Sequence, residues 1–191
     1  MRKMLFSSGL ALIIAISGIS ISHASPADFG AAGAEADQKY TLEEMLQYAI
    51  EDEFLAQAEY EIIIEEYGLI RPFSNVIRAE GRHISALLPL FEEYDYEIPS
   101  NDAKERTVIP DSLEEIFSVG VEAEIKNIEM YKSFLEEELP DDVRRVFENL
   151  MRASESHLKA FERSEARNTG GSNMFGGNSQ SKGFAFRYGT K

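Results

Sequence analysis

The sequence predicts an all-α protein, a four-helix bundle made of two helical hairpins joined by a longer crossover connection. Four segments of helical length, each with an apolar stripe, follow one another through residues 40–167. The links inside each pair are short, whereas the link between the pairs contains Pro99 and Pro110 and is long enough to cross the bundle from end to end. Polar residues also recur at matching positions of the two pairs, which indicates a duplicated hairpin.

The ends of the first hairpin's helices are marked by local signals. Thr41-Leu42-Glu43-Glu44 forms a capping box, and the helical pattern that follows runs to about Tyr67, before Gly68. Pro72 is suited to the first turn of the second helix, which runs to about Tyr94.

The second hairpin carries equivalent signals. Ser112-Leu113-Glu114-Glu115 caps a third helix to about Glu138, and Pro140 begins a fourth helix that fades after Arg167. Two stacked repeats of a helical solenoid are the alternative arrangement, but two units are too few to bury a core.

The two ends of the chain are expected to lie outside the bundle. Residues 1–24 have the pattern of a secretory signal peptide: Arg2 and Lys3, an apolar run, and small residues that favour cleavage after Ala24. The alternative is an uncleaved membrane anchor, although serines and a glycine dilute the run. We therefore expect an exported protein, periplasmic or extracellular, with no membrane insertion after cleavage.

Two further segments have compositions that do not favour a packed core. Residues 25–39 are small and polar and predict a disordered leader. Residues 168–191 contain six glycines with aromatic residues interspersed and predict an irregular tail.

Composition restricts the partners and the metal chemistry. Cleavage removes two of the 19 basic residues and none of the 34 acidic ones, which changes the formal charge from −15 to −17. Such a surface repels nucleic acid and attracts cations. The chain has no cysteine, so it has neither disulfides nor thiolate ligands, and any metal must be held by oxygen and imidazole.

The histidines occupy matching positions of the repeat. His83 and His157 are the two that remain after cleavage, and Arg78-Ala79-Glu80-Gly81-Arg82-His83 aligns with Arg152-Ala153-Ser154-Glu155-Ser156-His157. Each half also has a glutamate seven residues before a tyrosine, namely Glu53 with Tyr60 and Glu124 with Tyr131. The symmetry is broken where Ser154 stands opposite Glu80.

These polar residues fall on the apolar stripes of their helices. Buried carboxylates are costly and repel one another, whereas a divalent cation favours their ionised form, so the pattern predicts a metal site. Three alternatives remain: a glutamate paired with Arg78 or Arg152, a histidine bonded to a backbone carbonyl, and tyrosines that merely fill the core.

The motifs Glu53-x-x-Ala56-x-x-x-Tyr60, Glu80-x-x-His83 and Glu124-x-x-Asn127-x-x-x-Tyr131, followed by His157, resemble those of the ferritin-like superfamily. Within it the chain is similar to rubrerythrin-type domains, and especially to an exported group called the domain of unknown function 2202 family. The resemblance covers about residues 40–165.

The resemblance implies a di-iron site in which Glu80 bridges, Glu53 and Glu124 are terminal carboxylates, and His83 and His157 are terminal imidazoles. Around these ligands it implies a second layer formed by Tyr60, Asn127, Tyr131 and Ser154. It also implies oxidation of ferrous iron by oxygen or peroxide, or reduction of peroxide, with an electron donor that the sequence does not identify. The chain departs from the family pattern at Ser154, where a second bridging glutamate is expected, and it lacks the cysteine-ligated module of full rubrerythrins.

Two functions from different classes follow. The first is an exported metal-binding protein with a carboxylate–histidine site, holding two iron ions, or one if the site is degenerate, with manganese as the alternative metal. The second is a non-catalytic structural or interaction module on a ferritin-like scaffold. No nucleophile–base pair or phosphate-binding loop is present, so no catalytic residue is assigned. A homodimer is an assembly that the sequence leaves open.

Overall fold

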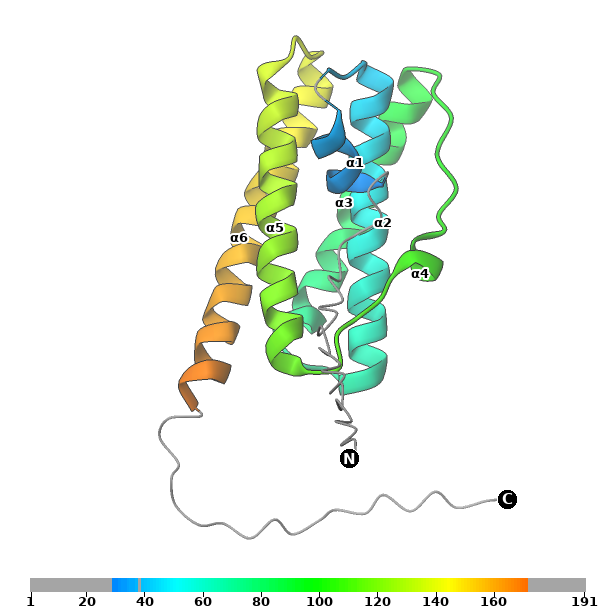
Figure 1. Cartoon of the computed structure of the whole chain (residues 1–191). Coiled ribbons are helices and arrows are strands. Elements are labelled where there is room, and N and C mark those ends of the chain that lie inside the picture. Colours follow the sequence, from blue (N-terminus) through cyan, green and yellow to red (C-terminus); the bar gives the residue numbers. More distant parts are fainter. Residues whose placement is uncertain (1–28, 38, 172–191) are drawn as a thin grey trace, which may run out of the picture.

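The computed structural model describes residues 29–37 and 39–171, and it confirms the all-α fold class. Four long helices form the bundle: α2 (Leu42–Tyr67), α3 (Phe73–Glu93), α5 (Leu113–Glu136) and α6 (Asp141–Gly171). Figure 1 shows α2 and α3 as one antiparallel hairpin and α5 and α6 as the other. Two short helices accompany them, α1 (Gly30–Ala36) and α4 (Ala103–Arg106).

The helix ends follow the capping signals. The Thr41 hydroxyl accepts a hydrogen bond from the Glu44 backbone N–H, and the Glu44 carboxylate accepts one from the Thr41 backbone N–H, so the predicted capping box is formed. Ser112 caps α5 in the same way through the Glu115 N–H. The last helix continues to Gly171 rather than fading after Arg167, because no proline or glycine interrupts α6 before residue 170.

The predicted disordered leader is wrong for the part of it that forms α1. This helix lies between α2 and α5 (Figure 1), and its small side chains allow its backbone to approach the bundle closely. Phe29 and Ala34 are buried there, and the N–H groups of Gly30 and Ala31 donate to the carboxylates of Glu51 and Asp52. The predicted signal peptide (residues 1–24), residues 25–28, residue 38 and residues 172–191 lie outside the described residues.

The crossover contains the short helix α4, which the sequence did not predict. The guanidinium of Arg106, at the end of α4, lies 4.7 Å from the centre of the Phe29 ring. A contact of this kind is favourable because the ring face is electron-rich. It connects the crossover to the segment that leads into α1.

The apolar core consists of two clusters at successive levels of the bundle. One contains Leu46, Phe91 and Phe147, and the other contains Phe73 and Phe161. On α3, α5 and α6 the predicted ligand positions fall in the sequence between the residues of one cluster and those of the other. On α2, Glu53 is followed by Phe54 and Ala58 of the first cluster before the second cluster begins. The polar residues therefore lie near the level where the two apolar clusters meet.

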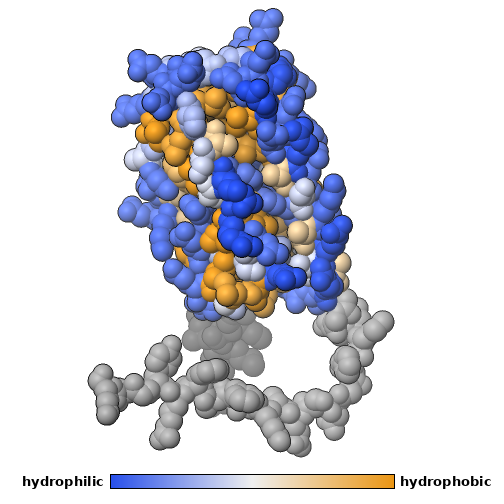
Figure 2. Space-filling model, turned by 180° about the vertical axis from the view of Figure 1, so that it is seen from behind, coloured by the Kyte–Doolittle hydropathy of each residue, from blue (hydrophilic) through white to orange (hydrophobic). Residues whose placement is uncertain are grey.

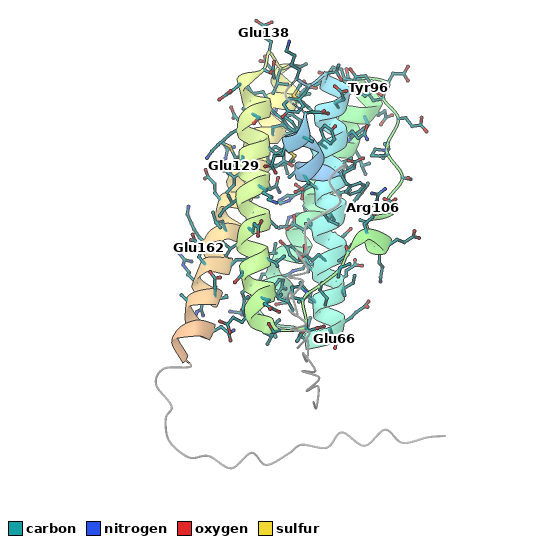
Figure 3. The ribbon with its side chains drawn as sticks, in the orientation of Figure 1. Glu66, Tyr96, Arg106, Glu129, Glu138 and Glu162 are labelled. Atoms are coloured by element: carbon teal, nitrogen blue, oxygen red, sulfur yellow. The ribbon has the colours of Figure 1, made fainter. Side chains whose placement is uncertain are left out.

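Most of the acidic charge lies on the outside. Glu66, Glu129, Glu138 and Glu162 all project from the bundle (Figure 3) and are exposed. Figure 2 shows the opposite face of the molecule, where two apolar areas interrupt a largely hydrophilic surface. Among the described helices, none combines the length and the apolar composition needed to cross a membrane.

Candidate metal centre

The five residues predicted as metal ligands come together inside the bundle. Glu53 comes from α2, Glu80 and His83 from α3, Glu124 from α5 and His157 from α6. The glutamates are almost fully buried, with 1%, 2% and 4% of their surfaces exposed in that order. The two histidines are less buried and lie at the edge of the site.

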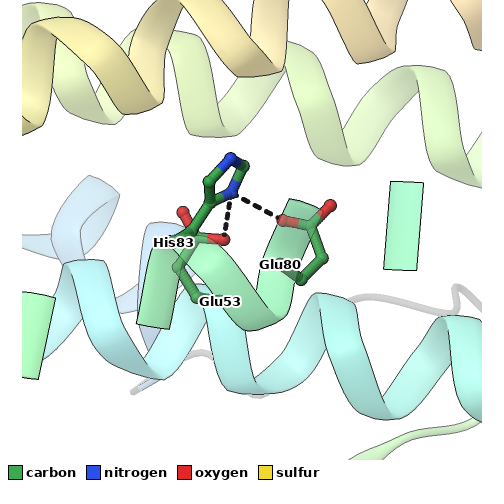
Figure 4. A group of neighbouring side chains, drawn as sticks. All are labelled: Glu53, Glu80 and His83. Carbon is green, nitrogen blue, oxygen red and sulfur yellow. Dashed lines mark hydrogen bonds and ion pairs between the residues drawn. The ribbon is translucent and has the colours of Figure 1, made fainter. Parts of the chain in front are cut away.

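The first group consists of Glu53, Glu80 and His83. The Nδ1 atom of His83 lies 3.0 Å from Glu53 Oε2 and 2.8 Å from Glu80 Oε2. Figure 4 shows this imidazole between the two carboxylates. The Glu-x-x-His spacing places Glu80 and His83 on one side of α3, less than one turn apart.

The second group consists of Glu80, Glu124 and His157. The Nδ1 atom of His157 lies 3.4 Å from Glu80 Oε1 and 3.3 Å from Glu124 Oε1. In each group the potential ligand atoms lie within 4.8 Å of one another. Glu80 therefore belongs to both groups, with one oxygen directed to each, and the two imidazoles stack at 5.7 Å.

The residues predicted around the ligands are also buried at this level. The Tyr60 hydroxyl donates to Glu124 Oε1 at 3.2 Å, and the Tyr131 hydroxyl donates to Glu53 Oε1 at 3.0 Å. Asn127 and Ser154 are buried, and the Asn127 side-chain oxygen has no hydrogen-bond partner among the residues that the structure describes. The helical periodicity identified the two tyrosines, the internal repeat identified Ser154 and the family resemblance identified Asn127. None of these showed that each tyrosine bonds the glutamate of the other hairpin.

Burial dominates the protonation of the site. It raises the pKa of Glu80 well above the usual value, and it raises the pKa of Glu124 despite the hydrogen bond to His157. Burial lowers the pKa of His83, but the carboxylates of Glu53 and Glu80 outweigh it and raise that pKa to about 10. Without a metal, protons and an imidazolium therefore balance the buried negative charge.

The donor set fits a divalent metal. Among the described residues Glu80 Oε1 makes no hydrogen bond, and the imidazole of His157 lies 3.4 Å from it. A buried carboxylate oxygen in this state is costly unless a cation approaches it. Carboxylate oxygen together with imidazole nitrogen suits iron or manganese. Within the described chain no arginine forms an ion pair with Glu53, Glu80 or Glu124; Arg152 instead pairs with Glu148 on the surface. The arginine-paired alternative is therefore excluded.

Two further acids near the site were not predicted. Burial raises the pKa of Asp52 to about 8 and that of Glu59 to about 7, and the charge of Glu124 contributes to both shifts. Each precedes a site residue on α2 by one position, so it points about 100° away from that residue. The periodicity gave no signal for them, because they lie beside the core stripe rather than on it.

Comparison with known proteins agrees with this architecture. The family model described as Rubrerythrin matches residues 44–165. Among solved structures, the crystal structure of hypothetical protein MJ0754 from Methanococcus jannaschii is similar, with a TM-score of 0.60 and 24% sequence identity over 70% of this chain and 85% of that one. At this identity the likeness shows the fold alone. No curated protein matches.

Proposed function

Because this chain belongs to the rubrerythrin family, within the ferritin-like superfamily, we propose that it binds two iron ions and uses them to oxidise ferrous iron or to reduce peroxide. The observation that carries the proposal is the position of Glu80. Its two oxygens face two separate groups, each completed by one further glutamate and one histidine. A carboxylate shared in this way suits a pair of ions better than a single ion.

Each residue then has a defined task. Glu53 and His83 would hold one ion, Glu124 and His157 the other, and Glu80 would bridge them. Tyr131 and Tyr60 orient the terminal carboxylates through their hydroxyls, which keeps one oxygen of each in a fixed place. The pair of ions, when bound, supplies the capacity to exchange electrons with oxygen or peroxide; manganese is the alternative metal.

Metal binding should displace protons from the site. The raised pKa values of Glu80 and His83 mean that the metal-free centre holds protons near neutral pH. Metal ligands must be deprotonated, so binding releases these protons and becomes tighter as the pH rises. Proton release during titration is therefore a signature that distinguishes this centre from ions bound at exposed surface acids.

The decisive experiment is an anaerobic ferrous iron titration of residues 25–191. We expect two ions per chain, and we expect Glu80→Gln to weaken both because it removes the shared charge. Glu122→Gln is the matched control, since Glu122 lies on α5 in an exposed position and should not alter binding. A wild-type stoichiometry near zero, or one unchanged in the His83→Ala/His157→Ala double variant, would contradict the proposal.

The second candidate function is a non-catalytic module on the same scaffold. The observation in its favour is Ser154, which occupies the repeat position of Glu80 and cannot supply a second bridging carboxylate. Stopped-flow mixing of the iron-loaded protein with oxygen and with hydrogen peroxide separates the candidates. Oxidation faster than that of free ferrous iron supports the redox function, whereas bound iron that reacts no faster supports the module.

We also propose that the protein is exported, in line with the exported group that the sequence resembles. The support is the pattern of residues 1–24, in which two basic residues precede an apolar run and small residues at the expected cleavage site. Expression of the full chain in a bacterial host, followed by fractionation and mass measurement, tests this. A mature protein beginning at Ser25 outside the cytoplasm supports export, and an uncleaved cytoplasmic or membrane-bound chain contradicts it.

A further inference from the structure

Ser154 faces the interior of the bundle. On α6 the residues with at most 2% of their surface exposed form one stripe: Val143, Phe147, Leu150, Ser154 and Phe161. Ser154 is the polar member of this stripe, and it precedes His157 by three residues, so both lie at the level of the metal centre. In the alignment of the two halves, Ser154 on α6 corresponds to Glu80 on α3, whose carboxylate belongs to both ligand groups.

The Ser154 side chain, 2% exposed, is not engaged by the rest of the described chain. Five other helical serines donate to the carbonyl four residues earlier, which is the usual solution for serine inside a helix: Ser85, Ser118, Ser133, Ser156 and Ser164. Within the described chain Ser154 makes no side-chain hydrogen bond, although it is more buried than any of these five. A buried hydroxyl normally has a partner, so a ligand is expected to provide one.

The charge of the centre indicates what that ligand is. Three ionised carboxylates supply a charge of −3, whereas two divalent ions supply +4, which leaves an excess positive charge in a buried site. An uncompensated buried charge is costly, so one additional monoanion is favoured. Serine is shorter than glutamate by one methylene and has a hydroxyl in place of the carboxylate, so the missing piece has the size of a small carboxylate.

We propose that the metal-loaded centre binds a small external monoanion with an O–C–O group, such as formate or bicarbonate, beside Ser154. The anion supplies the second bridge that the chain itself lacks, and the Ser154 hydroxyl donates a hydrogen bond to it. This inference rests on the proposed function, because the anion needs both ions to be present. It makes the occupancy of the centre dependent on the anion in the medium.

The test measures manganese binding, which avoids oxidation chemistry. Residues 25–191 are titrated with Mn²⁺, and free Mn²⁺ is followed by electron paramagnetic resonance in formate, bicarbonate, chloride or perchlorate at equal ionic strength. We expect formate or bicarbonate to tighten binding of the second ion by roughly 10- to 100-fold relative to chloride or perchlorate, at least as much as the loss of an outer-shell partner of a metal ligand usually costs. A stronger effect of formate than of bicarbonate, or the reverse, identifies the preferred anion.

Three variants sharpen the result. Ser154→Glu should bind the second ion tightly without formate, because it supplies the bridge from the chain. Ser154→Ala should reduce the formate effect, measured as the ratio of affinities in formate and in perchlorate for the same variant, and it avoids the risk that the glutamate variant fails to fold. Ser156→Ala is the matched control, since its exposed hydroxyl donates to the Arg152 carbonyl, and it should retain the full formate effect.

The outcomes separate the two proposals. Two Mn²⁺ ions bound with equal affinity in all four anions overturn this inference and leave the metal function intact. An undiminished formate effect in Ser154→Ala also overturns it, because the anion then binds elsewhere. Absence of Mn²⁺ binding in every anion overturns the proposed function, and this inference with it.

Discussion

Tyr131 donates a hydrogen bond of 3.0 Å to Glu53, a residue 78 positions earlier on the opposite hairpin. Tyr60 makes the reciprocal contact with Glu124 at 3.2 Å. Each hairpin therefore supplies the hydroxyl that orients the other hairpin's terminal carboxylate. The two halves are coupled through the site even before a metal is considered.

Replacing Tyr131 by phenylalanine tests this coupling. The Tyr131→Phe variant leaves one oxygen of a buried carboxylate without its donor, so we expect the metal-free protein to lose about 1–3 kcal/mol of unfolding free energy. Metal affinity should fall by roughly 10- to 100-fold, because the ligand loses its orienting partner. Urea denaturation with a chelator measures the first effect, and Mn²⁺ titration measures the second.

The control for this change is Tyr94→Phe. It removes a hydrogen bond of 2.8 Å to Asp142 near the end of α3, away from the metal centre. It should leave Mn²⁺ affinity unaltered. Equal loss of metal affinity in both tyrosine variants would mean that the effect is general destabilisation rather than orientation of Glu53.

Much of the bundle and its ligand layer follows from local sequence signals. Thr41 and Ser112 mark helix starts because a side-chain oxygen caps a free backbone N–H, and that requirement is local. Glu53, Glu80 and Glu124 were identified because periodicity shows which residues share a face, and a carboxylate on an apolar face needs an explanation. Neither inference depends on knowing which helices are neighbours.

The features that the sequence did not predict are contacts between distant segments, and they depend on which helices are neighbours in the fold. α1 consists largely of alanine and glycine and has no apolar periodicity. It is held by packing against α2 and α5 and by two carboxylates more than 20 positions further along the chain. The contact of Arg106 with Phe29 likewise joins the crossover to the N-terminal segment. The crossed tyrosine bonds require the two hairpins to be placed side by side.

The raised pKa of Glu59 predicts a pH-dependent effect on stability. Burial and the charge of Glu124 raise that pKa to about 7 from the ordinary value of 4.5. The folded state thus favours the protonated form of Glu59. The contribution of Glu59 to the unfolding free energy is therefore fully present below about pH 4.5 and is lost as the pH rises through 7.

We therefore expect Glu59→Gln to stabilise the metal-free protein at pH 8 and to change little at pH 5. The gain should be about 1–2 kcal/mol, less than the shift alone implies at about 1.4 kcal/mol per pKa unit, because the side chain is partly exposed. Urea denaturation at both pH values measures it. The exposed control Glu61→Gln should show no such pH dependence. A gain in Glu59→Gln that is equal at both pH values would contradict the assignment.

The packing of α1 predicts a strong effect at Gly30. This residue has φ +56°, and a Cβ atom there would lie 2.9 Å from Asp52 Oδ1 and 3.0 Å from Asp52 Cα. We expect Gly30→Ala to reduce the unfolding free energy by about 1–3 kcal/mol and to expose the amides of α1 to hydrogen exchange. Gly68→Ala also has a positive φ, but nothing lies within 4 Å of its Cβ, so its loss should be smaller. Equal losses would show that α1 does not pack tightly against Asp52.

Two glycines inside the long helices should respond to alanine in opposite directions. At Gly81 an added Cβ would meet only Gln57 Nε2, at an ordinary contact distance of 3.6 Å, so alanine brings only its better helix propensity. At Gly120 an added Cβ would lie 2.7 Å from the ring of Phe161. This ring is fully buried and cannot turn away without disturbing the apolar cluster that it forms with Phe73. We expect Gly81→Ala to gain about 0.5–1 kcal/mol of unfolding free energy and Gly120→Ala to lose about 1–3 kcal/mol.

Urea denaturation of both variants, metal-free and at the same pH, measures the pair. The control for the second change is the double variant Gly120→Ala/Phe161→Leu. It should lose less unfolding free energy than the two single variants together, because the smaller leucine makes room for the added methyl group. Strict additivity, or a Gly120→Ala protein as stable as the wild type, would show that the Phe161 ring moves aside at no cost and that α5 and α6 are not in tight contact at this level.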